Sequence, residues 1–213
     1  MAESLIVGSA DLIDKRRIRI KGEEFEVELF YSPQNLPEKL QDELADRIGG
    51  RLISGKPCLE ITKNNAAFSI ENEDYSVIGF AKNVKNIRPM SDDEASGTLQ
   101  LYKWCNDDSP PELWLNDLCR ITSLKGKDKP ETSPLQALLK VFESVARVAK
   151  LKYMYLMVEN KEPERTILPE VYKKYGFRIT TCCSLTDDDS LVMRKDLRKR
   201  RKTRKRTHKR HRP

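Results

Sequence analysis

One strand–helix–strand succession in the second half of the chain constrains its fold more than any other pattern. The strand candidate at 112–122 precedes an amphipathic segment at 134–150, and the compact apolar run YMYLMV at 153–158 follows it. Ser133 and Pro134 stand where a helix prefers its cap and its first-turn proline. Because a helix that connects two strands of one sheet makes a right-handed crossover, we expect these strands to be parallel neighbours.

The N-terminal half has the alternating pattern of β-strands. The segment RRIRIKGEEFEVELFYS predicts a hairpin around KGEE, and AAFSI and YSVIGFAKNV predict a second hairpin around ENED. Between them, LPEKLQDELADRI spaces its apolar residues four apart, as in an amphipathic helix. The sequence therefore predicts an α/β (α+β) fold, in which a mixed twisted sheet is flanked by helices.

Charge is divided sharply between the body of the chain and its C-terminal tail. Residues 198–213 contain 11 Lys or Arg among 16 residues, whereas residues 1–193 carry 27 basic and 32 acidic side chains. Like charges at the density of the tail repel one another and attract polyanions. We expect a folded domain at 1–197 and a disordered tail at 198–213, for which nucleic-acid binding, nuclear import and virion packaging remain alternatives.

Histidine is missing from residues 1–207, because the two histidines are His208 and His211. A catalytic group built on imidazole and a His-ligated metal are therefore excluded from the folded part. Five cysteines without a C-x-x-C pair indicate neither a disulfide framework nor a zinc site, so we expect free thiols.

No apolar run approaches the roughly 20 residues that a membrane helix needs, and the N-terminus lacks the pattern of a signal peptide. We expect a soluble, intracellular protein that does not bind membranes. The cytoplasm, the nucleus and the virion all remain open.

The order of the predicted elements, together with the motif Y-x-K-x-G-F at 172–177, resembles the GNAT superfamily of acyl-CoA-dependent N-acyltransferases. In this comparison LWLNDLCRI corresponds to the family's fourth strand, and VYKKYGF to its fourth helix and sixth strand. The helix from Pro134 corresponds to the one whose N-terminus holds the coenzyme pyrophosphate. The basic tail resembles in composition those of some large-DNA-virus proteins.

The resemblance implies transfer of an acetyl group from acetyl-CoA to a primary amine of a small molecule or a protein. Tyr172 would protonate the departing thiolate, and Asp117 would take the amine proton, with Glu112 and Asn116 as alternative positions for the base. No step requires a metal. The residues implied to bind the coenzyme are Leu118, Cys119, Arg120, Ile121, Lys125, Gly126 and Lys127.

The segment before the long helix departs from the family's R/Q-x-x-G-x-G/A loop. Glu131, Ser133 and Leu135 stand where small residues are expected, and Pro134 removes an N–H group. A second hypothesis is therefore a catalytically degenerate GNAT-like scaffold that carries a nucleic-acid-binding or nuclear-targeting tail. Binding of the coenzyme would separate the two hypotheses.

Overall fold

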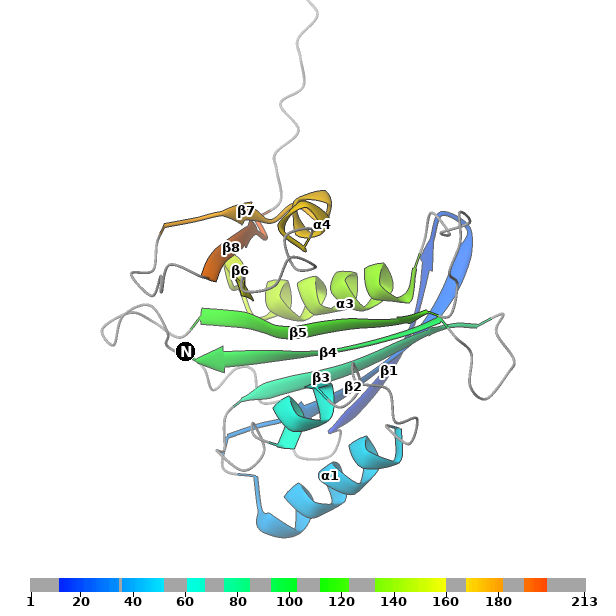
Figure 1. The fold of residues 1–213 in the computed structure, drawn as a ribbon. Helices are drawn as coiled ribbons and strands as arrows, with labels where there is room; N and C mark the ends of the chain where they lie inside the picture. The colour runs from blue at the N-terminus through cyan, green and yellow to red at the C-terminus, as the bar shows by residue number, and fades with distance from the viewer. Residues whose placement is uncertain are drawn as a thin grey trace, which may run out of the picture.

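The computed structural model describes residues 12–34, 36–51, 61–67, 75–84, 93–102, 112–122, 133–159, 168–181 and 190–198. One eight-stranded sheet runs through them in the order β1-β2-β3-β4-β5-β6-β8-β7 (Figure 1). The sheet is mixed, because β5 and β6 are parallel and the other pairs are antiparallel. The predicted fold class and the predicted parallel pair are both confirmed.

The strands are β1 (Ile13–Ile20), β2 (Glu23–Ser32), β3 (Ser76–Asn83), β4 (Asp93–Tyr102), β5 (Glu112–Thr122), β6 (Tyr153–Glu159), β7 (Arg178–Ile179) and β8 (Ser190–Asp196). The helices are α1 (Glu38–Arg51), α3 (Pro134–Val148) and α4 (Leu168–Lys174), with a further short helix at 61–67. Among the described residues, no helix is long and apolar enough to cross a membrane.

The hairpin predicted around KGEE joins β1 and β2. Lys21 and Gly22 form its two-residue turn with φ angles of 47° and 90°, and Ile20 pairs with Glu23. Two consecutive positive φ values give the turn a twist that matches the twist of the strands. The turn therefore determines the register of the first strand pair.

The second predicted hairpin is wrong in its first strand. Ala66 and Ala67 belong to the helix at 61–67, and residues 68–74 lie outside the described ranges. Strand β3 pairs with β2 and β4 instead. The helix buries Thr62 and Ala66, which lie four residues apart on one side, so burial against the sheet outweighs the weak alternation of the sequence.

The sheet lies between α3 on one face and α1 on the other (Figure 1). On the first face, Leu138 and Phe142 of α3 are fully buried against the strands. Gly79 and Gly97 pair with each other beneath this helix, and a Cβ at Gly79 would lie 2.5 Å from Cδ1 of Leu138. Glycine therefore lets α3 approach the middle of the sheet closely.

Candidate functional site

Strands β5 and β6 separate in the middle of the sheet. Their parallel ladder joins only Leu113 to Met154, Trp114 to Tyr155 and Leu115 to Leu156, although β5 continues to Thr122. Beyond Leu115, the edge of β5 that faces β6 has no neighbouring strand among the described residues. An extended ligand can lie along such an edge and bind to backbone groups, as peptides do when they extend a sheet.

A bulge in β5 marks the point of separation. Strand β4 pairs its Thr98 with Asp117 and its Leu99 with Leu115, so Asn116 is the additional residue. The side chain of Asn116 is hydrogen-bonded to Gln100. Because a bulge changes the direction of the side chains that follow it, it determines where Asp117 points.

Asp117 is held by two donors from the short helix at 61–67. Its Oδ2 accepts a hydrogen bond from Thr62 Oγ1 at 2.5 Å, and its Oδ1 accepts one from Asn65 Nδ2 at 2.9 Å. Thr62 Oγ1 also lies 2.8 Å from the hydroxyl of buried Ser96. Burial raises the pKa of Asp117 above its ordinary value, while the bonds from Thr62 and Asn65 act in the opposite direction.

Tyr172 reaches the same region from α4. Its ring lies edge-on to Phe177, with 5.9 Å between ring centres, and packs against the core under α3. Burial raises the pKa of Tyr172 to about 12, and the negative charge of nearby Asp117 adds to the rise. The phenol therefore keeps its proton at neutral pH and can donate it.

The helix stop that follows Tyr172 keeps it in this position. Gly176 has a φ of 90°, and Phe177 N donates to Tyr172 O at 3.2 Å, which closes the end of α4. The chain then enters β7 at Arg178. This geometry is the helix-to-strand junction predicted from the motif Y-x-K-x-G-F.

The three candidate positions for a base have different surroundings. Asn116 already binds Gln100, and Glu112 lies at the first residue of β5. Burial raises the pKa of Glu112, while its hydrogen bond to Tyr155 and the charge of Arg194 lower that pKa. Asp117 is the carboxyl group whose charge reaches Tyr172.

The residues predicted to bind the coenzyme fall into three groups. Leu118 and Cys119 lie on β5 just beyond the bulge, and Arg120 and Ile121 continue the same strand. The segment Lys125, Gly126 and Lys127 lies outside the described residues.

Cys119 corrects the expectation of free thiols, because it is disulfide-bonded. None of the other four cysteines belongs to the described residues, so the structure does not identify its partner. Among the described residues, no group of three or more His, Cys, Asp and Glu side chains could hold a metal ion.

The N-terminus of α3 offers few donors to a phosphate. Ser133 caps the helix by accepting a hydrogen bond from Gln136 N at 3.3 Å, and Pro134 has no N–H group. Ala137 N donates to Ser133 O. The first turn therefore uses most of its own N–H groups, as the departure from the glycine-rich loop predicts.

Sequence reasoning missed three residues of the site, namely Thr62, Asn65 and Ser96. Thr62 and Asn65 lie on the helix at 61–67, three residues apart and facing Asp117. Ser96 is a buried polar residue of β4, and its hydroxyl group contacts Thr62. The signal available for Ser96 was a polar residue at a strand position where alternation predicts a buried side chain.

No family model matches the chain, and no curated protein matches it. Solved structures do resemble it. A protein from Desulfovibrio desulfuricans assigned to the acetyltransferases of the GNAT family is 12% identical, with a TM-score of 0.46, 81% of this chain covered and 99% of that chain. A GNAT-family acetyltransferase from Listeria monocytogenes is 12% identical, with a TM-score of 0.44 and coverages of 85% and 99%.

A third solved structure is the aminoglycoside N-acetyltransferase AAC(6')-Iy in complex with CoA. It is 14% identical, with a TM-score of 0.40, and the match covers 76% of this chain and 93% of that chain. The solved structures described above are thus acetyltransferases, two of them assigned to the GNAT family that the sequence resembles.

Proposed function

We propose that this protein is an acetyl-CoA-dependent N-acetyltransferase that acts on a primary amine. The observation that carries the proposal is that a carboxyl group and a protonated phenol lie near each other where β5 leaves β6. Asp117 lies just beyond the bulge, and Tyr172 lies close enough for the charge of Asp117 to raise its pKa. One group can take a proton and the other can give one.

The reaction requires two proton transfers, and these residues supply them. The amine nitrogen attacks the thioester carbonyl, so that a C–N bond forms and the C–S bond breaks. Asp117 accepts the proton that the amine loses, directly or through a water molecule, and Tyr172 gives its proton to the departing sulfur. Backbone N–H groups of β5 beyond the bulge would polarise the carbonyl oxygen.

The environment of Asp117 suits a general base. A raised pKa makes the carboxylate a better proton acceptor, and the bonds from Thr62 and Asn65 hold it in one orientation.

The open edge of β5 fits an extended thiol-bearing chain such as the pantetheine arm of the coenzyme. Residues Leu118 to Ile121 would hold that arm through their backbone. The capped N-terminus of α3 is a poorer partner for the pyrophosphate, because Ser133 and Pro134 leave it few donors. Charge from Lys125 and Lys127 would compensate, in a folded domain that we place at 1–197.

The test of this proposal is binding followed by turnover. Acetyl-CoA at 100 times its dissociation constant should stabilise the protein by about 2.7 kcal/mol, which a thermal melt detects. A panel of primary amines should then release free thiol from acetyl-CoA. A protein that neither gains stability nor releases thiol would be the degenerate scaffold of the second hypothesis.

The tail supports a second function, the binding of nucleic acid. The observation is its density of charge, 11 Lys or Arg among residues 198–213. If the tail contacts about 6 to 8 phosphates, the logarithm of the binding constant for duplex DNA should fall with the logarithm of salt concentration at a slope of roughly −5 to −7. Fluorescence anisotropy over a salt series measures that slope.

The control is a full-length protein whose tail has the same residues in scrambled order. Phosphate contacts carry no sequence information by themselves, so the scrambled tail should give the same slope and no preference among DNA sequences. A loss of binding in the scrambled variant would contradict the electrostatic account of the tail.

A further inference from the structure

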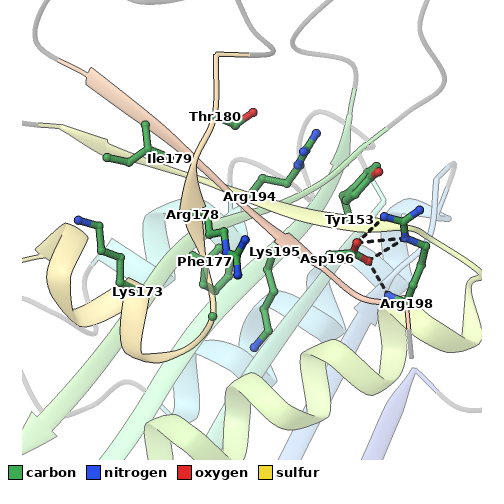
Figure 2. Close-up of a pocket in the computed structure, with 11 residues that line it drawn as sticks. Tyr153, Lys173, Phe177, Arg178, Ile179, Thr180, Arg194, Lys195, Asp196 and Arg198 are labelled. Carbon is green, nitrogen blue, oxygen red and sulfur yellow. Dashed lines mark hydrogen bonds and ion pairs between the residues drawn. The ribbon is translucent and has the colours of Figure 1, made fainter. Parts of the chain in front are cut away.

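A basic pocket lies at the edge of the sheet where the folded part meets the tail. It encloses about 880 Å³ between the end of α4, the edge strand β7, its neighbour β8 and the start of β6. Its charged lining residues are Lys173, Arg178, Arg194, Lys195, Arg198 and Asp196 (Figure 2). This concentration of positive charge is local, because residues 1–198 as a whole carry 30 basic and 33 acidic side chains.

The basic side chains of the pocket differ in the ion pairs and hydrogen bonds that they make with neighbouring residues. Lys195 turns toward α3, where it pairs with Glu143 and donates to Tyr175 O at 2.5 Å. Lys173 pairs with Glu170, and its side chain is 46% exposed. Exposed ion pairs of this kind contribute little and can exchange for a phosphate.

Arg194 and Arg198 share an aromatic platform. Their guanidinium carbons lie 4.4 Å and 5.5 Å from the centre of the Tyr153 ring, and Figure 2 shows the three side chains together. Arg198 also binds Asp196, and its hydrogen bonds lower the pKa of that carboxyl to about 2. Arg194 presents a forked donor of the kind that binds phosphate oxygens in pairs, whereas the fork of Arg198 is engaged by Asp196.

We propose that this pocket binds the phosphate backbone of a nucleic-acid strand at the point where the tail begins. Arg178 and Arg194 supply the phosphate contacts, with support from Arg198 and Lys173. The proposal rests on the second proposed function, the binding of nucleic acid by the tail. It adds that the folded part contacts the same nucleic acid.

Continuity with the tail favours nucleic acid over a small anion. Arg198 lines the pocket, and ten more Lys or Arg follow it within residues 199–213. A strand bound by the tail is therefore held at high effective concentration beside the pocket.

The experiment compares full-length variants by fluorescence anisotropy with a labelled 20-base-pair duplex over a salt series. The pocket variant carries R178Q and R194Q. The matched control carries R19Q and R47Q, which remove the same charge from exposed positions on β1 and α1. A third variant replaces the ten Lys and Arg of residues 199–212 with Gln.

The pocket variant should have a slope shallower than wild type by about 2, since each lost phosphate contact removes about 0.9. The control pair should leave the slope unchanged. The tail-neutralised variant should keep weak binding with a slope of about −2, and adding R178Q and R194Q to it should abolish that binding. Thermal melts establish that each variant is folded.

R178Q alone keeps the proposal testable if R194Q disturbs the platform over Tyr153, because Arg178 is exposed. That single change should reduce the slope by about 0.9. A pocket variant with the slope of the control pair would overturn the proposal, even if the tail binds as expected. Displacement of DNA from the tail-neutralised variant by acetyl-CoA would also overturn the proposal. Binding of that variant to phosphatidylserine vesicles but not to DNA would overturn it as well.

Discussion

Tyr172→Phe should lower turnover by roughly 100- to 10,000-fold, the range expected when a general acid is lost. The substitution removes only the hydroxyl, so the ring keeps its edge contact with Phe177 and the melting temperature should change little. Steady-state kinetics with acetyl-CoA should show the loss in kcat, with KM for the coenzyme nearly unchanged.

Tyr175→Phe is the matched control for that substitution. Tyr175 lies three residues farther along the same segment, is also partly buried against the core, and offers Lys195 its backbone oxygen rather than its hydroxyl. Its loss should leave turnover within a few fold of wild type. Equal losses in the two variants would show that the packing of the segment matters, and not a proton from Tyr172.

Asp117→Asn should lower kcat/KM by roughly 100- to 10,000-fold, because the amide cannot accept the amine proton. The pKa of Asp117 is raised above the ordinary value of about 3.9. In the wild type, activity should therefore fall as the pH drops through this raised pKa. The variant should lack this acidic limb. A pH profile of kcat/KM for both proteins measures the difference.

The same substitution should also stabilise the protein near neutral pH. A folded-state pKa raised above the unfolded value adds stability below pH of about 3.9, and this stability is lost as pH rises through the folded pKa. Above the folded-state pKa, burial of the ionised carboxylate lowers the free energy of unfolding. The neutral side chain of Asn avoids this loss. The melting temperature of the variant should therefore exceed that of wild type at neutral pH, and the gain should shrink in acid.

Glu112→Gln is the control for this pair of effects. Burial raises the pKa of Glu112 as well, so the variant should show the same direction of stability change. Its activity should stay within a few fold of wild type, because Glu112 lies at the start of β5 and away from the bulge. A large loss of activity in this variant would assign the base to Glu112.

The strand–helix–strand unit could be predicted because three independent signals agree on it. The apolar face of α3, its Ser-Pro start and the two flanking apolar strands all point to one crossover. The helix-to-strand junction after Tyr172 could be predicted because Gly176 accepts the positive φ that ends a helix, whereas the role of Tyr172 rests on the family resemblance alone. These signals lie within short stretches of sequence, so they can be recognised without knowledge of the tertiary contacts.

The partners of Asp117 could not be predicted in the same way. Thr62 and Asn65 contact it across more than 50 positions of sequence, with separations of 55 and 52 residues. The seven-residue helix that carries them is stabilised by burial of Ala66 against Phe30 and Ile78 rather than by a long periodic pattern. The disulfide at Cys119 likewise depends on a second cysteine that no spacing rule identifies.

Only three residue pairs join β5 and β6, so few backbone hydrogen bonds connect strands β1 to β5 with β6, β8 and β7. Side chains of α3 also reach this second group, since Arg147 donates to Leu197 O and Glu143 pairs with Lys195. A chain that lies along the open edge of β5 would complete the missing ladder. Occupation of this edge should therefore slow amide hydrogen exchange in β5, because it adds backbone hydrogen bonds where the ladder to β6 ends.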